Sequence, residues 1–145
     1  MRATAILRGA ALVTLLLATG HLLGNPWTPV TDDAGARVVN AMNGYHFDVT
    51  GVARSYFDFY VGFGWLIGAY LLGHAALFWQ LATLAPRAGA DVRPIVAVLC
   101  AESLCVSLLS LRFLFWIPVA LSSVVSICLL LALFALRPRS LTPTA

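Results

Sequence analysis

Lysine is absent from this chain, and acidic residues are few. All nine basic residues are arginines and only six residues are aspartate or glutamate, so charged residues make up 10% of the 145. A soluble domain has about 25% charged and about 45–50% apolar residues, whereas 61% of this chain is hydrophobic. A soluble fold has no way to bury that much apolar surface. The composition predicts a membrane protein, and the net charge of +3 does not indicate a nucleic-acid partner.

Sequence patterns of catalytic and metal sites are also missing. The chain contains no GxSxG, HExxH or phosphate-binding glycine motif. Cys100, Cys105 and Cys128 lie in apolar stretches and form no CxxC pair, so no disulfide framework or zinc pattern is indicated. His46 and Asp48 are too isolated to predict a metal ligand set. We expect no metal and no cofactor, and the sequence favours a non-enzymatic protein while leaving that question open.

Long apolar runs predict an all-α protein: a four-transmembrane-helix bundle that forms a single membrane domain over residues 1–145. The helices are expected at about residues 5–23, 55–85, 95–111 and 118–136. The first run also resembles a signal peptide, because Arg2 and Arg8 precede it and small residues lie near position 20. We prefer a retained helix to a cleaved leader of residues 1–20, because it gives the later segments a packing partner.

One long connection, residues 25–54, separates the first two helices. Asp32 or Thr31 can cap a short helix that continues to about Met42, and Gly51 marks a later turn. The aromatic and aliphatic content of the connection predicts that it is ordered. The arginines predict that it lies outside the cytoplasm, in a bacterial inner membrane protein whose two termini are cytoplasmic. That topology places six arginines inside and three outside: Arg2, Arg8, Arg87, Arg93, Arg137 and Arg139 against Arg37, Arg54 and Arg112.

The second helix is the element around which the chain is organised. Ser55 and Asp58 have the spacing of a capping pair at its start. Gly64 and Gly68 form a GxxxG motif, which permits another helix to approach closely. Pro86 is predicted to end the helix, and residues 86–94 to form a polar turn.

Serines predict how the third and fourth helices pack. Ser103, Ser107 and Ser110 share one face of the third helix, and Ser122 and Ser126 share one face of the fourth. Because small residues let helices approach closely in lipid, we expect these faces to meet. Pro118 is expected in the first turn of the fourth helix.

Two groups of polar residues are candidates for a functional site. Glu102 and His74 are predicted deep inside the membrane, at similar depths, where an ionisable group is costly and often functional. A Glu–His pair there can relay a proton, and it can equally serve only to hold helices together. The outer-face candidates are His21, Arg54, Asp58 and Arg112. Among these we expect Asp58 to form a structural ion pair with Arg112 or Arg54.

The passage from Ala41-Met42 through Gly51 to residues 54–64, RSYFDFYVGFG, resembles a family of small bacterial four-helix membrane proteins of unknown function. The resemblance covers about half of the chain and implies the architecture and a bacterial membrane, but no activity.

Three functions remain open from the sequence. The first is a non-enzymatic membrane protein that binds a lipid, an apolar small molecule or a partner subunit, with a homo-oligomer as one form of partnership. The second is a proton-coupled small-molecule transporter that uses Glu102. The third is a membrane enzyme that acts on an apolar substrate with His74 and Glu102 as acid and base.

Overall fold

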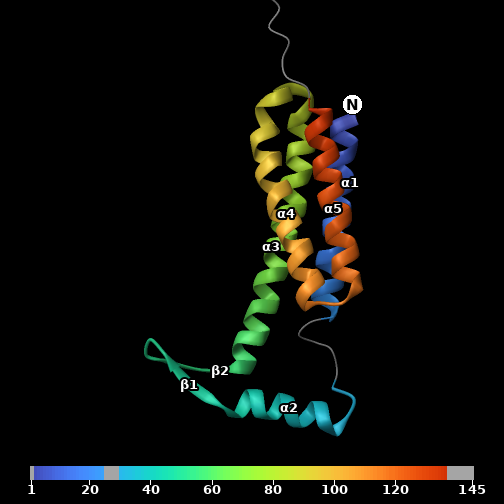
Figure 1. Ribbon diagram of the computed structural model, residues 1–145. Helices are drawn as coiled ribbons and strands as arrows, with labels where there is room; N and C mark the ends of the chain where they lie inside the picture. Colours follow the sequence, from blue (N-terminus) through green and yellow to red (C-terminus); the bar gives the residue numbers. More distant parts are fainter. Residues whose placement is uncertain (1, 25–29, 137–145) are drawn as a thin grey trace, which may run out of the picture. The chain divides into compact units, whose positions relative to one another are not determined.

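A computed structural model describes residues 2–24 and 30–136 of the protein, and this part of the chain is predominantly helical (Figure 1). The elements in chain order are α1 (Arg2–Gly24), α2 (Asp33–Gly44), β1 (His46–Val49), β2 (Val52–Ser55), α3 (Tyr56–Ala88), the 3₁₀ helix η1 (Gly89–Val92), α4 (Arg93–Phe113) and α5 (Trp116–Ala135). Arg137 and Arg139, used in the topology prediction, lie outside the described residues.

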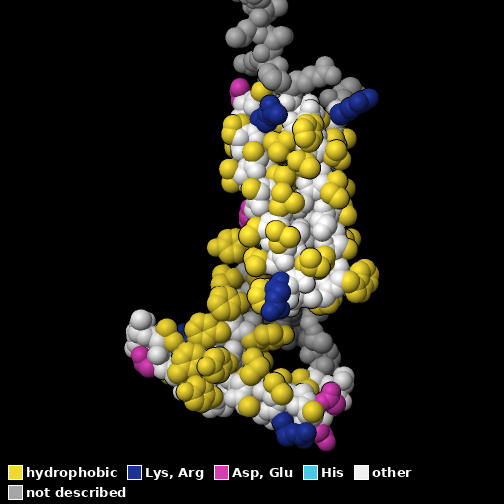
Figure 2. Space-filling model, in the orientation of Figure 1, with side chains coloured by type: hydrophobic (Ala, Val, Ile, Leu, Met, Phe, Trp, Pro, Cys, Tyr) yellow, Lys and Arg dark blue, Asp and Glu magenta, His cyan; other side chains and the backbone are white. Residues whose placement is uncertain are grey.

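Three helical segments of the described chain are long and apolar enough to cross a membrane. They are Arg2–Gly24, Tyr56–Phe113 and Trp116–Ala135. Hydrophobic side chains are spread over the visible face of the helices, and few charged side chains interrupt them (Figure 2). The expectation of a helical membrane protein is therefore met at this level.

The turn after α3 differs from its prediction. α3 continues through Pro86 to Ala88, where we expected it to end near residue 85. Pro86 cannot donate a backbone hydrogen bond, and the helix continues for only two residues beyond it. The break comes instead at Gly89, whose φ of +54° is readily adopted only by residues such as glycine. The expected polar turn is thus mostly helical, and α4 already begins at Arg93.

The other helix boundaries differ from the predicted ones by at most three residues. α1 begins at Arg2 rather than near residue 5, and α5 begins at Trp116, which leaves Pro118 inside its first turn. Helix ends commonly vary by this amount because terminal turns lack part of their hydrogen bonding.

The chain divides into two compact units, residues 1–17 with 71–145 and residues 18–70. α1 and α3 each contribute to both. The prediction of a single membrane domain stays a prediction.

In the first unit, segments of α1, α3, α4 and α5 lie side by side around a common core (Figure 1). Leu7, Val96 and Leu129 are fully buried there, from three different helices. Alanines supply much of the remaining contact surface: Ala3, Ala10, Ala11, Ala82, Ala85 and Ala132. Small side chains allow close helix approach, which is the main source of helix association where lipid replaces water.

The predicted serine faces of α4 and α5 meet. The Ser126 Oγ atom lies 2.9 Å from Ser103 Oγ and 3.2 Å from Ser107 Oγ. Ser122 and Ser126 also donate hydrogen bonds within α5, to the carbonyls of Pro118 and Ser122. The hydroxyls of Ser103, Ser107, Ser122 and Ser126 therefore each have a partner, which lets these polar groups be buried between two apolar helices.

The second unit contains a β-hairpin that the sequence analysis did not predict. β1 and β2 pair antiparallel, with Val49 opposite Val52. Thr50 and Gly51 form the two-residue turn, with φ values of +53° and +87°. Positive φ at both central residues is the geometry of a type I′ turn, whose twist matches that of the paired strands. The Gly51 N–H also donates to Asp48 Oδ1 at 2.9 Å.

The short helix predicted in this connection is α2. Asp32 precedes it, and its Oδ1 atom accepts a hydrogen bond of 2.7 Å from the Gly35 N–H. A carboxylate at this position satisfies one free amide and suits the positive end of the helix. None of its residues is buried, and Gly35, Ala36, Val39 and Met42 are half-buried.

Candidate functional site

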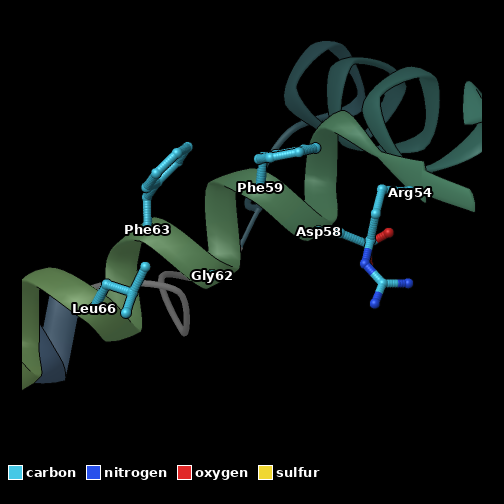
Figure 3. A pocket seen from close by; sticks show the side chains of 6 residues that line it. All are labelled: Arg54, Asp58, Phe59, Gly62, Phe63 and Leu66. Carbon is cyan, nitrogen blue, oxygen red and sulfur yellow. The ribbon is translucent and has the colours of Figure 1, made fainter. Parts of the chain in front are cut away.

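A shallow pocket of about 210 Å³ lies in the second unit along the first three turns of α3. Arg54 comes from the end of β2, and the rest of the lining comes from α3: Asp58, Phe59, Gly62, Phe63 and Leu66 (Figure 3). The charged groups lie at the end where α3 begins, and Leu66 lies eight residues further along the helix. At 1.5 Å per residue the lining changes from charged to aliphatic over about 12 Å.

A reciprocal capping arrangement holds the charged end in place. The Ser55 N–H donates to Asp58 Oδ2 at 2.8 Å, and the Asp58 N–H donates to Ser55 Oγ at 3.1 Å. This is the capping pair that the sequence predicted, with aspartate in the position where glutamate is more usual. Ser55 is fully buried, so the pair also anchors β2 to the start of α3.

Five aromatic rings connect the hairpin to the first turns of α3. The Phe47 and Phe59 rings stack with centroids 5.7 Å apart, and Tyr45 stacks on Tyr56 at 5.8 Å. Phe47 also meets Tyr56 at 5.0 Å, and Phe59 meets Phe63 at 5.9 Å. The cluster makes the pocket wall continuous with the hairpin. Tyr45, Tyr56 and Phe63 remain more than half exposed, as suits rings at a membrane surface.

The GxxxG motif of α3 is a site of close approach by α1 in this unit. His21 Nε2 lies 2.8 Å from the Gly64 carbonyl oxygen. A Cβ atom on Gly68 would collide with Leu22, so only glycine fits there without a shift of that side chain. His21 is thus bonded to the helix backbone and is not among the residues that line the pocket.

The first unit brings together the two candidates predicted inside the membrane. His74 Nε2 lies 3.0 Å from Glu102 Oε2, which joins α3 to α4. The Phe78 ring packs edge-on against the imidazole at 6.0 Å. The side chains of His74 and Glu102 are 27% and 48% exposed, so the pair lies at the surface of its unit rather than in its core.

Two arginines of the first unit, Arg8 and Arg112, lie against aromatic rings, and the sequence analysis did not predict these contacts. The Arg112 guanidinium lies 5.1 Å from the centroid of the Phe113 ring, and Arg8 lies at the same distance from the Trp79 ring. Each is a cation–π contact within the first unit. The predicted Asp58–Arg112 pair joins residues of different units and stays a prediction. Arg54 and Asp58 share the pocket lining.

Among the described residues, no group of three His, Cys, Asp or Glu side chains is arranged to hold a metal ion. The three cysteines are free thiols, with Cys100 buried and Cys105 exposed. Cys100 packs in the core cluster, and its thiol lies 3.9 Å from the Ser126 carbonyl oxygen. It therefore serves as a small packing residue.

The chain was compared with known proteins in three ways. No family model, no curated protein and no solved structure matches it. The function of this protein therefore has to be argued from its own residues.

Proposed function

We propose that the protein is a multi-pass bacterial inner membrane protein that crosses the membrane four times and binds a phospholipid at the outer end of α3. The segment Tyr56–Phe113 would cross twice, because η1 divides it into helices of 33 and 21 residues. At 1.5 Å per residue these are about 50 Å and 32 Å long, and either is enough for a hydrocarbon layer of about 30 Å. The arginine distribution supports cytoplasmic termini and an outer residue 25–54 connection.

The observation that carries the lipid proposal is the order of groups along the pocket. Its charged end lies where α3 begins, and its apolar end lies deeper along a membrane-crossing helix. A phospholipid has the same order, with a charged headgroup at the surface and hydrocarbon below. Aromatic rings around the charged end fit the level of the headgroups.

Arg54 is the group we expect to bind the lipid phosphate. Its guanidinium is exposed, and one of its N–H groups donates to the Ala53 carbonyl oxygen at 3.0 Å. A guanidinium has five donors, so the others remain for a phosphate. Asp58 keeps one carboxylate oxygen beyond the capping bond, which suits the ammonium of phosphatidylethanolamine. Phe59, Phe63 and Leu66 would contact the upper part of an acyl chain.

Native mass spectrometry of the full chain, with phosphatidylethanolamine added to the detergent, tests this function. Arg54→Gln should lower the association constant for the lipid, measured by titration, by about tenfold, the scale of one charge-assisted hydrogen bond. Arg37→Gln is the matched control, because Arg37 is an exposed arginine of α2 outside the pocket. Equal lipid retention by the two variants would count against the proposal.

A second candidate function rests on the 3.0 Å contact between His74 and Glu102. A carboxylate and an imidazole that are hydrogen-bonded and partly accessible can exchange a proton, as a proton-coupled transporter or an acid–base enzyme requires. Proteoliposomes that contain a pH-sensitive dye and an imposed pH gradient test this reading. Glu102→Gln should then slow the collapse of the gradient with protein level unchanged. No change relative to the unsubstituted protein would argue against the transporter.

A further inference from the structure

Arg8 of α1 lies over the ring of Trp79 of α3, in the part of the first unit where α1 begins and α3 ends. The guanidinium carbon is 5.1 Å from the ring centroid, Arg8 is exposed, and Trp79 is 46% exposed. Arg8 is six residues into its helix, and Trp79 is nine residues before the last residue of α3. At 1.5 Å per residue these are depths of about 9 Å and 14 Å, which lie within a membrane if both helices cross it.

No acidic side chain of the described residues balances the charge of Arg8. The ion pair found in this part of the chain joins His74 to Glu102, and no described residue accepts a hydrogen bond from the Arg8 guanidinium. An arginine at membrane depth pairs with another charge or a polar group, because lipid tails provide neither. The contact with the Trp79 ring compensates only part of this cost. The five N–H donors of the guanidinium are therefore left for an anion from outside the described chain.

This end of the first unit has an excess of positive charge. The first residues of α1 and α4 and the last turn of α3 lie at the same end (Figure 1). They contain Arg2, Arg93 and Arg87, and Asp91 of η1 is the one acidic residue of the described chain between α3 and α4. The excess favours an anionic ligand over a zwitterionic one.

Exposed hydrocarbon continues along α1 from Arg8 toward the middle of the helix. Leu12 and Leu16 follow at spacings of four residues, on the same side of α1, and are 58% and 60% exposed. A cation near the end of a membrane helix, with aliphatic side chains deeper along it, matches the order of groups in a phospholipid. A free phosphate or an acidic peptide would leave this hydrocarbon uncovered.

We propose that Arg8 and Trp79 form a binding site for an anionic phospholipid, such as phosphatidylglycerol. The guanidinium donates two parallel hydrogen bonds to the lipid phosphate, which is the strongest geometry for such a pair. The Trp79 ring holds the guanidinium in place, and an acyl chain lies along Leu12 and Leu16. The site requires that α1 and α3 cross the membrane, which is part of the proposed function, and it is independent of the pocket at Arg54.

The fluorescence of Trp79 tests this site directly, because bromine atoms on an acyl chain quench a tryptophan that they contact. A chain with Trp27→Phe, Trp65→Phe and Trp116→Phe keeps Trp79 as its sole tryptophan. It is reconstituted in vesicles of phosphatidylcholine and phosphatidylglycerol, with bromine on one of the two lipids at a time. Phosphatidylglycerol should associate at Trp79 about tenfold more strongly than phosphatidylcholine, the scale of one charge-assisted hydrogen bond.

Arg8→Gln should abolish this preference, while continued quenching by brominated phosphatidylcholine shows that the variant is still inserted. Arg112→Gln is the matched control and should leave the preference unchanged, because Arg112 is also an exposed arginine of the first unit, 5.1 Å from the Phe113 ring. Equal association of the two lipids, or a preference that survives Arg8→Gln, would overturn the proposed site alone. Absence of quenching by either lipid would overturn both the site and the membrane crossing that it requires.

Discussion

The Ser55 and Asp58 side chains each accept a hydrogen bond from the other's backbone N–H, at 3.1 Å and 2.8 Å, and so join β2 to the first turn of α3. Without these two bonds, two amide groups at the start of a long apolar helix would lack a partner. The same carboxylate lies at the charged end of the proposed lipid pocket.

The first prediction concerns this capping pair. Ser55→Ala should lower the free energy of unfolding by about 0.5–2 kcal/mol, as loss of an N-terminal cap does. Because the two bonds support each other, the loss of stability in the Ser55→Ala/Asp58→Ala double variant should be smaller than the sum of the two single losses. Detergent unfolding of the single and double variants measures this coupling. Strictly additive losses would show that the two side chains act independently.

A second double-mutant cycle, which combines Asp58→Ala with Arg112→Ala, tests the predicted Asp58–Arg112 pair.

The second prediction concerns Gly68, where Leu22 of α1 lies close to α3 in the second unit. Gly68→Leu should destabilise the protein by about 1–3 kcal/mol, because the new side chain must displace Leu22. Gly73→Leu is the control, since a Cβ there meets no atom within 4 Å. Leu22→Ala should restore part of the loss. Equal stability of the Gly68 and Gly73 variants in detergent unfolding would contradict the close approach.

The third prediction concerns the contact between His74 and Glu102. Glu102→Gln should keep the protein folded, because the amide still offers an oxygen to the imidazole. Glu102→Ala should cost about 0.6 kcal/mol and at most about 1.7 kcal/mol, the range for polar contacts between membrane helices. The loss from His74→Ala should then be smaller in the Glu102→Ala background than in the unsubstituted chain, although the ring contact of His74 with Phe78 is lost in both. A coupling energy near zero in this double-mutant cycle would mean that the pair contributes nothing to stability.

The fourth prediction concerns topology. A cysteine placed at Asp33 in a cysteine-free chain should react with a membrane-impermeant thiol reagent in intact cells. Its position in α2 makes it accessible, because α2 has no buried residue. Reaction only after the cells are opened would reverse the proposed orientation. Loss of residues 1–20 from the mature protein would reduce the number of crossings to three.

Much of the architecture follows from local sequence. The helices that are long and apolar enough to cross a membrane follow from apolar runs longer than a soluble core requires. The serine seam was predictable because helical periodicity places Ser103 and Ser107 on one face of α4 and Ser122 and Ser126 on one face of α5. The capping pair was predictable because both partners lie in one turn of chain.

Other features depended on the tertiary structure. The hairpin between His46 and Ser55 was missed because four-residue strands carry too little periodicity, and Thr-Gly is not a typical turn pair. The boundary predicted from Pro86 was wrong, because α3 includes the proline and ends two residues later, at Ala88. Their similar predicted depths in the membrane indicated that His74 and Glu102 could meet. Depth alone does not determine which way each side chain faces around its helix. The rotation of α3 and α4 about their own axes put the pair at the surface of its unit, and packing against the other helices determines that rotation.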